Sequence, residues 1–269
     1  MNFEKRFEVH RKQKLKLEKR DPDDTAGITS KEECDQQLKK NIEQLFDTQS
    51  LLAASNEYAV LLVLQALDAG GKDGTIRHVM TGLNPQACRV TSFKVPSDEE
   101  AQHDFLWRVH HAVPKRGEIG IFNRSHYEDV LVARVHKLVP KAVWQARYDQ
   151  INDFEHMLAE NKTIILKFYL NISKDEQKRR LEERIQDPRK NWKFSEADVA
   201  ERRHWDDYIS AYEDALSKCS AKHAPWYVIP ANKKWFRNLA VSQIMLDTLE
   251  SMDLKSPKPI ADLKGISFE

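Results

Sequence analysis

The sequence predicts an α/β fold in which five short parallel strands form one sheet with helices on both faces. Five short apolar segments alternate with segments of helical spacing along the 269 residues, which is typical of parallel strands joined by right-handed crossovers. The first apolar segment is almost continuously hydrophobic, as expected of a strand buried on both faces. A glycine-rich turn and a helix follow it directly, and ligands of such sheets bind at the carboxyl ends of the strands.

The composition fits one large α/β domain in a reducing compartment. Hydrophobic residues make up 41% of the chain, enough for a sizeable core, and the formal net charge of +1 argues against a general attraction to nucleic acid. The cysteines Cys34, Cys88 and Cys219 are widely spaced, which argues against a disulfide framework or a zinc site and favours the cytoplasm. The charged N-terminus and the lack of any apolar run long enough to span a bilayer predict neither export nor a membrane partner.

Residues 1–29 form an arm of mixed charge that is basic at first and acidic at Asp21-Pro22-Asp23-Asp24. We slightly favour a solvated arm over an ordered arm that wraps the core or a neighbouring subunit. A single domain is expected over residues 30–255. An irregular tail with two prolines is expected over residues 256–269.

The remaining elements follow from hydrophobic spacing and capping residues. The first helix begins after Ser30, an N-cap candidate with Glu33 three residues further on, and ends near Ser55. Further helices are expected from residue 72 and at 97–113, 130–138, 141–160, 173–185, 195–217 and 234–252. Strands are expected at 58–67, 87–95, 118–122, 163–170 and 226–229. The polar residues at the strand ends are Asp68, Asn123, Arg124, Asn171 and Asn232.

The residues after the first strand, Leu67-Asp68-Ala69-Gly70-Gly71-Lys72-Asp73-Gly74-Thr75, form a phosphate cradle. Small residues let backbone N–H groups turn toward an anion, the helix N-terminus adds about half a positive charge, and Lys72 reaches the outer phosphate. Two positions depart from the P-loop pattern, because Ala66 replaces its first glycine and Asp73 its Ser or Thr. Since that hydroxyl ligand is missing, Asp68 becomes the candidate Mg²⁺ ligand. The alternative is an ordinary glycine turn that caps a helix.

The third strand ends in Asn123-Arg124, at the place where P-loop enzymes carry an acid. Phosphoryl transfer needs a cradle, Mg²⁺ ligands and cations around the transferred group. Asn123 is a candidate neutral metal ligand and Arg124 a candidate phosphate contact. The alternative is a turn that only ends the strand.

A cluster of cations lies within residues 178–193, interrupted by acidic residues. Its members are Lys178, Arg179, Arg180, Arg184, Arg189, Lys190 and Lys193. The cluster follows a helix that leaves the sheet and precedes the next long helix, where nucleotide kinases insert a lid. We therefore favour a mobile lid at about 186–200 over a plain solvated face.

The histidines are poorly spaced for metal binding. His110 and His111 are adjacent and would point to different sides of a helix, so we interpret them as structural residues.

Several longer motifs accompany the phosphate cradle. They are Gly82-Leu83-Asn84-Pro85, Ser92-Phe93-Lys94-Val95-Pro96, Ile121-Phe122-Asn123-Arg124-Ser125-His126-Tyr127-Glu128, Ser173-Lys174-Asp175-Glu176-Gln177, Asn191-Trp192-Lys193-Phe194-Ser195 and Ala224-Pro225-Trp226-Tyr227-Val228-Ile229-Pro230-Ala231. Together with the cradle they make the chain resemble a family-2 polyphosphate kinase from about Asp21 to Glu250. The resemblance implies a P-loop kinase fold like that of thymidylate kinase, with a helical lid, assembled as a dimer or tetramer.

The resemblance also implies the reaction and the residues that serve it. A family-2 polyphosphate kinase moves the terminal phosphoryl group of inorganic polyphosphate to a nucleotide with Mg²⁺, and here the acceptors would be AMP and ADP, giving ADP and ATP. The catalytic candidates are Asp68, Lys72, Asn123, Arg124 and Arg184, with Asp68 and Asn123 as metal ligands. The candidates for nucleotide or polyphosphate binding are Gly70, Gly71, Gly74, Thr75, Arg77, Glu128, Arg134, Arg180, Arg189, Lys193 and Asp198.

Two departures from the family pattern affect these roles. Many members carry Asp where this chain has Asn123, which is a weaker metal ligand, so more of the metal binding should fall on Asp68. Many also carry Tyr-Asn where this chain has Tyr127-Glu128. The form found here is similar to the subclass, called class III, that accepts both AMP and ADP.

Two other functions remain open from the residues alone. An ATP-dependent nucleotide kinase would phosphorylate a monophosphate with ATP in the absence of polyphosphate. A non-catalytic regulator would bind nucleotide or polyphosphate without turnover.

Overall fold

The structure is a computed structural model of the chain, and it describes residues 2–10, 14–189 and 191–259. The side chain of Lys193 is not described. Lys190 of the predicted lid and residues 260–269 of the predicted tail therefore lie outside the described residues.

Five parallel strands form a single sheet, as the sequence predicts. They are β1 (Ala59–Gln65), β2 (Cys88–Ser92), β3 (Ile119–Asn123), β4 (Thr163–Asn171) and β5 (Trp226–Pro230), in the spatial order β2-β3-β1-β4-β5. The register pairs Leu64 and Ser92 with Asn123 at the ends of three neighbouring strands. The carboxyl ends of these strands therefore meet at one edge, as the sequence predicts for a ligand site.

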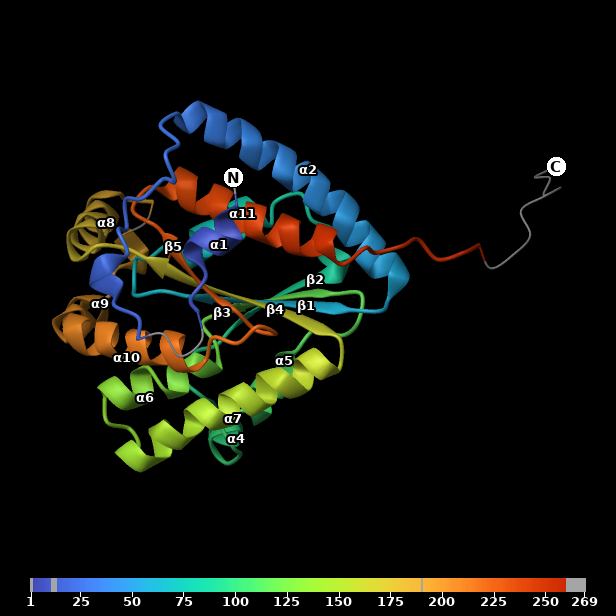
Figure 1. Cartoon of the computed structure of the whole chain (residues 1–269). Coiled ribbons are helices and arrows are strands. Elements are labelled where there is room, and N and C mark those ends of the chain that lie inside the picture. The colour runs from blue at the N-terminus through green and yellow to red at the C-terminus, as the bar shows by residue number, and fades with distance from the viewer. Residues whose placement is uncertain (1, 11–13, 190, 260–269) are drawn as a thin grey trace.

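Helices cover both faces of the sheet (Figure 1). The helices α1 (Phe3–Phe7), α2 (Lys31–Ser55), α3 (Lys72–Val79) and α11 (Lys234–Ser251) lie on one face. The helices α5 (Trp107–Ala112), α7 (Lys141–Glu160) and α10 (Trp205–Lys218) lie on the other, with the short α6 (Val132–Val135) beside them. The helices α8 (Lys174–Gln186) and α9 (Glu196–Glu201) lie beyond the carboxyl ends of the strands. No helix of the described chain is both long enough and apolar enough to cross a membrane.

The central strand β1 is buried along its whole length because it divides the core in two. Val60, Leu62 and Leu64 pack into the cluster with α2 and α11. Leu61 and Val63 point the other way, toward α7 and α10. This alternation explains why the segment reads as a continuous apolar run.

Two predicted helices are each split in the structure. The expected helix at 97–113 is α4 (Asp98–Ala101) followed by α5, because the side chain of Asp104 accepts a hydrogen bond from the N–H of Leu106 at 2.9 Å and forms a turn. The expected helix at 195–217 is α9, a 3-10 turn at Arg202–His204 and α10.

The helix expected at 130–138 is reduced to the four residues of α6. A 3-10 turn at His126–Asp129 precedes it, and the Oγ atom of Ser125 caps that turn by accepting from the N–H of Tyr127 at 3.2 Å. Lys137 ends the segment with a positive φ of 54°.

The described part of the N-terminal arm packs on the core, so the favoured prediction of a solvated arm is wrong. Phe3 and Phe7 are buried and meet Phe236 of α11 edge to face. Further along, the N–H of Val9 donates to the carbonyl of Trp226 at 2.8 Å, at the outer edge of β5. Phe3 and Phe7 lie four residues apart on α1 and therefore share one side of the helix, where they make the apolar contact with the core. The many charged residues of the arm do not indicate this contact.

Candidate active site

A cleft of about 960 Å³ lies at the carboxyl ends of the strands. The loop after β1, the end of β3, the helices α8 and α9 and the first turn of α11 line it. The structure brings to this cleft most of the residues predicted for phosphates and metal: Asp68, Gly70, Gly71, Lys72, Gly74, Arg77, Asn123, Arg124, Arg180, Arg184 and Asp198.

The loop needs glycine at two positions. A Cβ atom at Gly70 would lie 2.5 Å from the Cβ of Ala66 and 2.7 Å from the carbonyl oxygen of Leu67. Gly71 has a φ of 104°, and a Cβ there would lie 1.9 Å from Nη1 of Arg237. The loop therefore turns tightly into α3 and keeps its backbone accessible, as a phosphate cradle requires.

Lys72 is the first residue of α3 and its ammonium group is buried in the loop. Its Nζ atom donates to the carbonyl oxygen of Ala66 at 2.8 Å. Burial lowers the pKa of Lys72, and the nearby carboxylate of Asp68 partly offsets that effect. The cation is thus poorly solvated, and an incoming phosphate would be a stronger acceptor than the carbonyl it now contacts.

Asp68 and Arg124 form an ion pair across the cleft. Nη2 of Arg124 donates to Oδ1 of Asp68 at 2.8 Å, and Arg124 is held in the left-handed region at a φ of 61°. Burial alone would lower the pKa of Arg124, but the carboxylates of Glu128 and Asp68 outweigh it and raise that pKa. The pair fixes one carboxylate oxygen of Asp68 and leaves the other for a further partner.

Asp73 of α3 and Asn123 of β3 also meet at the cleft. The amide Nδ2 of Asn123 donates to Oδ1 of Asp73 at 2.8 Å. No group of three or more His, Cys, Asp or Glu side chains within the described chain is arranged to hold an ion by itself. Mg²⁺ needs only one or two carboxylates when phosphate oxygens and water complete its shell, so the hard oxygens of Asp68 and Asp73 fit this ion.

Glu128 does not line the cleft. Burial raises its pKa, while the charges of Arg124 and Lys72 and a hydrogen bond from Gln65 act in the opposite direction. The carboxyl group of Glu128 therefore interacts electrostatically with Arg124 and Lys72, the two cations that would bind phosphate.

An ion pair links the two helices at the ends of the predicted lid segment. Nη1 of Arg184 on α8 donates to Oδ2 of Asp198 on α9 at 2.7 Å. Burial and the charge of Asp68 raise the pKa of Asp198, and Arg184 partly offsets this. The lid carboxylate therefore lies within electrostatic reach of the phosphate loop.

Arg180 lines the cleft, but its guanidinium N–H groups donate to backbone carbonyls of the protein. Its Nη1 atom donates to the carbonyls of Ala69 and Gly70 at 3.0 and 3.2 Å, and its Nη2 atom donates to those of Ala231 and Asn232 at 2.5 and 3.0 Å. It therefore ties the phosphate loop to the end of β5.

Besides Glu128, three predicted binding residues do not line the cleft: Thr75, Arg134 and Arg189. Thr75 is buried and its hydroxyl donates to the carbonyl of Gly71 at 3.1 Å. Arg134 pairs with Asp214 at 2.6 Å on the face of the sheet covered by α10. Arg189 is exposed and pairs with Asp187 two residues earlier. Both arginines are therefore held by carboxylates outside the cleft. The spacing of cations along the sequence could not show which of them would be paired in this way.

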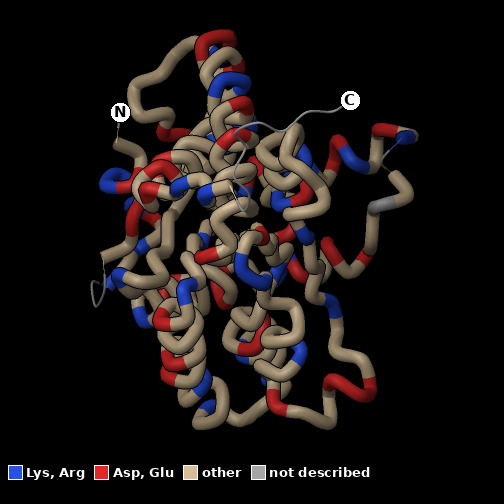
Figure 2. Tube along the Cα trace, turned by 90° about the vertical axis from the view of Figure 1, so that its right-hand side faces the viewer, with Lys and Arg blue, Asp and Glu red and all other residues tan. Residues whose placement is uncertain are grey.

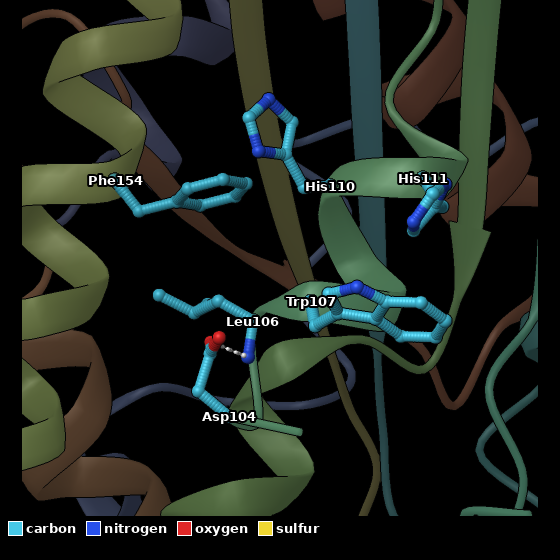
Figure 3. Close-up of a pocket in the computed structure, with 6 residues that line it drawn as sticks. All are labelled: Asp104, Leu106, Trp107, His110, His111 and Phe154. Atoms are coloured by element: carbon cyan, nitrogen blue, oxygen red, sulfur yellow. Dashed lines mark hydrogen bonds between the residues drawn. The ribbon is translucent and has the colours of Figure 1, made fainter. Parts of the chain in front are cut away.

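A second pocket, of about 340 Å³, lies between α5 and α7 (Figure 3). His111 packs edge to face with Trp107, while His110 meets Phe154 of α7. The adjacent histidines thus have different neighbours, as their positions on a helix predict. The lining residues are aromatic or histidine apart from Asp104 and Leu106, so the cleft at the strand ends is the better candidate for phosphate chemistry.

Comparison with known proteins identifies the family. The family model described as Polyphosphate kinase 2 (PPK2) matches residues 28–257. The chain belongs to the polyphosphate kinase 2 family. This membership confirms the resemblance that the sequence motifs indicate.

Several proteins resemble this polyphosphate kinase 2 chain over nearly its whole length. The AMP/ADP-polyphosphate phosphotransferase of Meiothermus ruber is 51% identical over 269 residues, covering 98% of this chain and 100% of that protein. The ADP-polyphosphate phosphotransferase of Rhodopseudomonas palustris is 48% identical, covering 94% and 92%. A crystal structure of polyphosphate kinase 2 from Arthrobacter aurescens TC1 superposes with a TM-score of 0.94 at 44% identity, covering 98% of this chain and 94% of that one.

The cleft also contains side chains that the sequence did not predict as site residues. They are Asp73, Lys94, Lys234, Arg237 and Asn238. Lys234 and Arg237 lie three apart at the start of the helix that follows the last strand, and this spacing places both on one side of the helix. The position of that helix beside the phosphate loop depends on the strand order, which the sequence pattern does not give.

Proposed function

We propose that this protein transfers the terminal phosphoryl group of inorganic polyphosphate to AMP and to ADP, forming ADP and ATP. The observation that carries the proposal is the cleft, in which a buried lysine, an Asp–Arg ion pair and a lid surround a phosphate loop, in a chain that aligns end to end with an AMP/ADP-polyphosphate phosphotransferase. The acceptor range is the finer part of the proposal, because a second relative of similar identity is named for ADP alone.

The residues of the cleft supply positioning and positive charge. In the transfer, an oxygen of the acceptor's terminal phosphate forms a bond to the donor's terminal phosphorus, and the bond from that phosphorus to the next bridging oxygen breaks. Lys72 and Arg124 lie where they can neutralise the charge on the transferred group. Asp68 orients Arg124 through their ion pair.

We further propose that Mg²⁺ serves the reaction. Asp68 would hold it, with Asp73 and the amide oxygen of Asn123 as further hard oxygen ligands. When bound, the ion would supply charge stabilisation to the phosphate oxygens. The need for Mg²⁺ is checked by omitting it and by adding a chelator.

We also propose that the enzyme is a homo-oligomer of two or four chains and acts in the cytoplasm. The resemblance to the family supports the assembly, and the three free cysteines suit a reducing compartment. Light scattering coupled to size exclusion measures the oligomeric state.

Phosphorus NMR of the purified protein with Mg²⁺, long-chain polyphosphate and AMP, without ATP, tests the function. We expect the polymer signal to fall while ADP and then ATP signals appear. Conversion of ADP but not of AMP would keep polyphosphate as the donor and remove AMP from the acceptors. No product from either nucleotide, together with phosphorylation of AMP by ATP, would instead indicate an ATP-dependent nucleotide kinase.

A further inference from the structure

The first turn of α11 brings two cations to the cleft on the side of β4 and β5. Lys234 and Arg237 both line it, and Arg237 lies beside Gly71 and Gly74 of the phosphate loop. A Cβ atom placed on Gly71 would lie 1.9 Å from Nη1 of Arg237 and 3.6 Å from Nη1 of Arg180. Two guanidinium groups therefore approach the same glycine of the loop.

Arg237 is buried without a carboxylate among its described neighbours. Its side chain donates through Nε and Nη2 to Oδ1 of Asn238, at 3.2 and 2.8 Å, and the residue is only 2% exposed. Burial lowers its pKa to about 9, and the charge of Arg180 adds to that effect. A buried guanidinium is stabilised by an anion, and the acceptor that the described residues provide here is a neutral amide oxygen.

Five cations of α8 and the lid contrast with this arrangement, because carboxylates already neutralise them. Lys178 pairs with Glu182, Arg179 and Arg180 with Glu176, Arg184 with Asp198, and Arg189 with Asp187. In Figure 2, Lys and Arg are interspersed with Asp and Glu along much of the trace of the whole chain. A polyanion that bound the lid helix would have to displace these carboxylates, whereas none pairs with Lys234 or Arg237 within the described chain.

We infer that Lys234 and Arg237 form a second anion subsite of the cleft, which holds phosphate groups of the donor chain next to the one transferred. This inference rests on the proposed function. A linear polyphosphate extending from Lys72 over Gly71 toward α11 would meet these two cations in turn. Burial lowers the pKa of Lys234, and within the described chain Glu183 and Glu176 act in the opposite direction without forming an ion pair with it. Asn238 fixes the guanidinium of Arg237 so that its Nη1 edge faces the loop.

Lys234→Gln tests the subsite, with Lys233→Gln as its matched control. Both residues are exposed lysines at the start of α11, and the described contact of the Lys233 ammonium is the carbonyl of Asp23 in the arm, outside the cleft. We expect Lys234→Gln to raise the KM for long-chain polyphosphate roughly tenfold, as for the loss of one charge-assisted hydrogen bond, with the KM for AMP unchanged. Lys233→Gln should match the wild type in both constants.

Binding of long-chain polyphosphate without nucleotide, measured by calorimetry at several salt concentrations, tests the subsite separately from the proposed function. We expect weaker binding by Lys234→Gln and a smaller salt dependence than in the wild type. Equal binding by both variants, or a change in the KM for AMP alone, would overturn the subsite while leaving the donor assignment intact. A wild-type protein that neither binds nor consumes polyphosphate would overturn the proposed function and the subsite together. Arg237→Gln is a weaker test because it alters a buried residue.

Discussion

At the scale of single residues, Lys72 and Asp68 carry the strongest prediction. Lys72 now donates to a loop carbonyl, and Asp68 holds Arg124 in place. Lys72→Met and Asp68→Asn should each lower turnover roughly a hundredfold or more, the usual effect of removing a preorganised group that stabilises developing charge. Circular dichroism and thermal unfolding should show an intact fold. Near wild-type turnover in either variant would remove that residue from the proposed machinery.

Glu128 is expected to set the choice between AMP and ADP. Its carboxyl group acts on the pKa of Arg124 and of Lys72, so a neutral residue leaves both cations less compensated. Glu128→Asn should therefore favour ADP, which carries the extra phosphate charge, and lower kcat/KM for AMP relative to ADP. Asp129→Asn is the control, because Asp129 pairs with Arg147 at 3.1 Å and does not line the cleft. An unchanged preference in Glu128→Asn would show that this residue does not determine the acceptor.

At the scale of elements, a buried network anchors the loop that carries Arg124 and Glu128. Lys167 of β4 pairs with Glu155 of α7 and donates to the hydroxyl of Tyr127 at 2.9 Å. That hydroxyl in turn donates to Glu155 at 2.9 Å. All three side chains are buried. Removing the charge of Lys167 or of Glu155 therefore leaves the other charge buried without its partner.

Glu155→Leu alone should lower the free energy of unfolding by about 3–5 kcal/mol, because Lys167 is left buried and unpaired. Adding Lys167→Met should restore most of that loss, since two apolar side chains replace the pair. Urea denaturation of both single variants and the double variant measures this. Additive losses would show that the two residues do not act as a pair.

The same pair predicts how stability depends on acid. Burial alone would raise the pKa of Glu155, but Lys167 and His126 outweigh it and lower that pKa below its usual 4.5. The stabilisation from this carboxylate is therefore present above about pH 4.5 and lost as the pH falls through the folded-state pKa. As the pH is lowered from 5, the free energy of unfolding of the double variant should fall less than that of the wild type. Urea denaturation at each pH measures this.

The lid offers a matched pair of arginines. Arg184 pairs with Asp198 and both line the cleft, whereas the ion pair described for Arg189 is with Asp187, two residues earlier, and Arg189 is exposed. Arg184→Ala should lower kcat/KM for polyphosphate by about tenfold or more, as for loss of a charge-assisted contact that closes a lid. Arg189→Ala should stay close to the wild type, and equal losses in the two variants would contradict this view of the lid.

Element boundaries were predictable where one signal dominates. The helix at 141–160 begins after Pro140 and keeps its apolar stripe, and the structure gives it the same bounds. The helices expected at 97–113 and 195–217 have equally long stripes but are interrupted, the first by the turn at Asp104. Side-chain bonds of this kind compete locally with the helix and leave the apolar spacing unchanged, so the spacing overestimates helix length.

At the scale of the whole molecule, the predicted and missed site residues differ in how they reach the cleft. Asp68, Lys72 and Asn123 follow strands directly, and parallel strands bring their ends to one edge whatever their order. Lys234 and Arg237 reach the phosphate loop only because β4 lies between β1 and β5 in the sheet. Strand order depends on contacts distant in sequence, so hydrophobic periodicity could not assign these two cations to the site.

The N-terminal arm is rich in charged residues, yet it packs on the core through buried aromatic side chains. Phe7 is 3% exposed and its ring centroid lies 5.9 Å from that of Phe236, which precedes Arg237 in α11. Phe7→Ala should lower the free energy of unfolding by about 3–5 kcal/mol, the usual cost of emptying a buried aromatic site. Arg6→Ala is the control, because its half-exposed ion pair with Asp24 contributes about 1 kcal/mol or less. Urea denaturation separates the two costs, and a Phe7→Ala loss no larger than that of Arg6→Ala would mean that the arm does not fold as part of the core. A large loss would instead make the arm a support for α11, and so for the cations that α11 presents to the cleft.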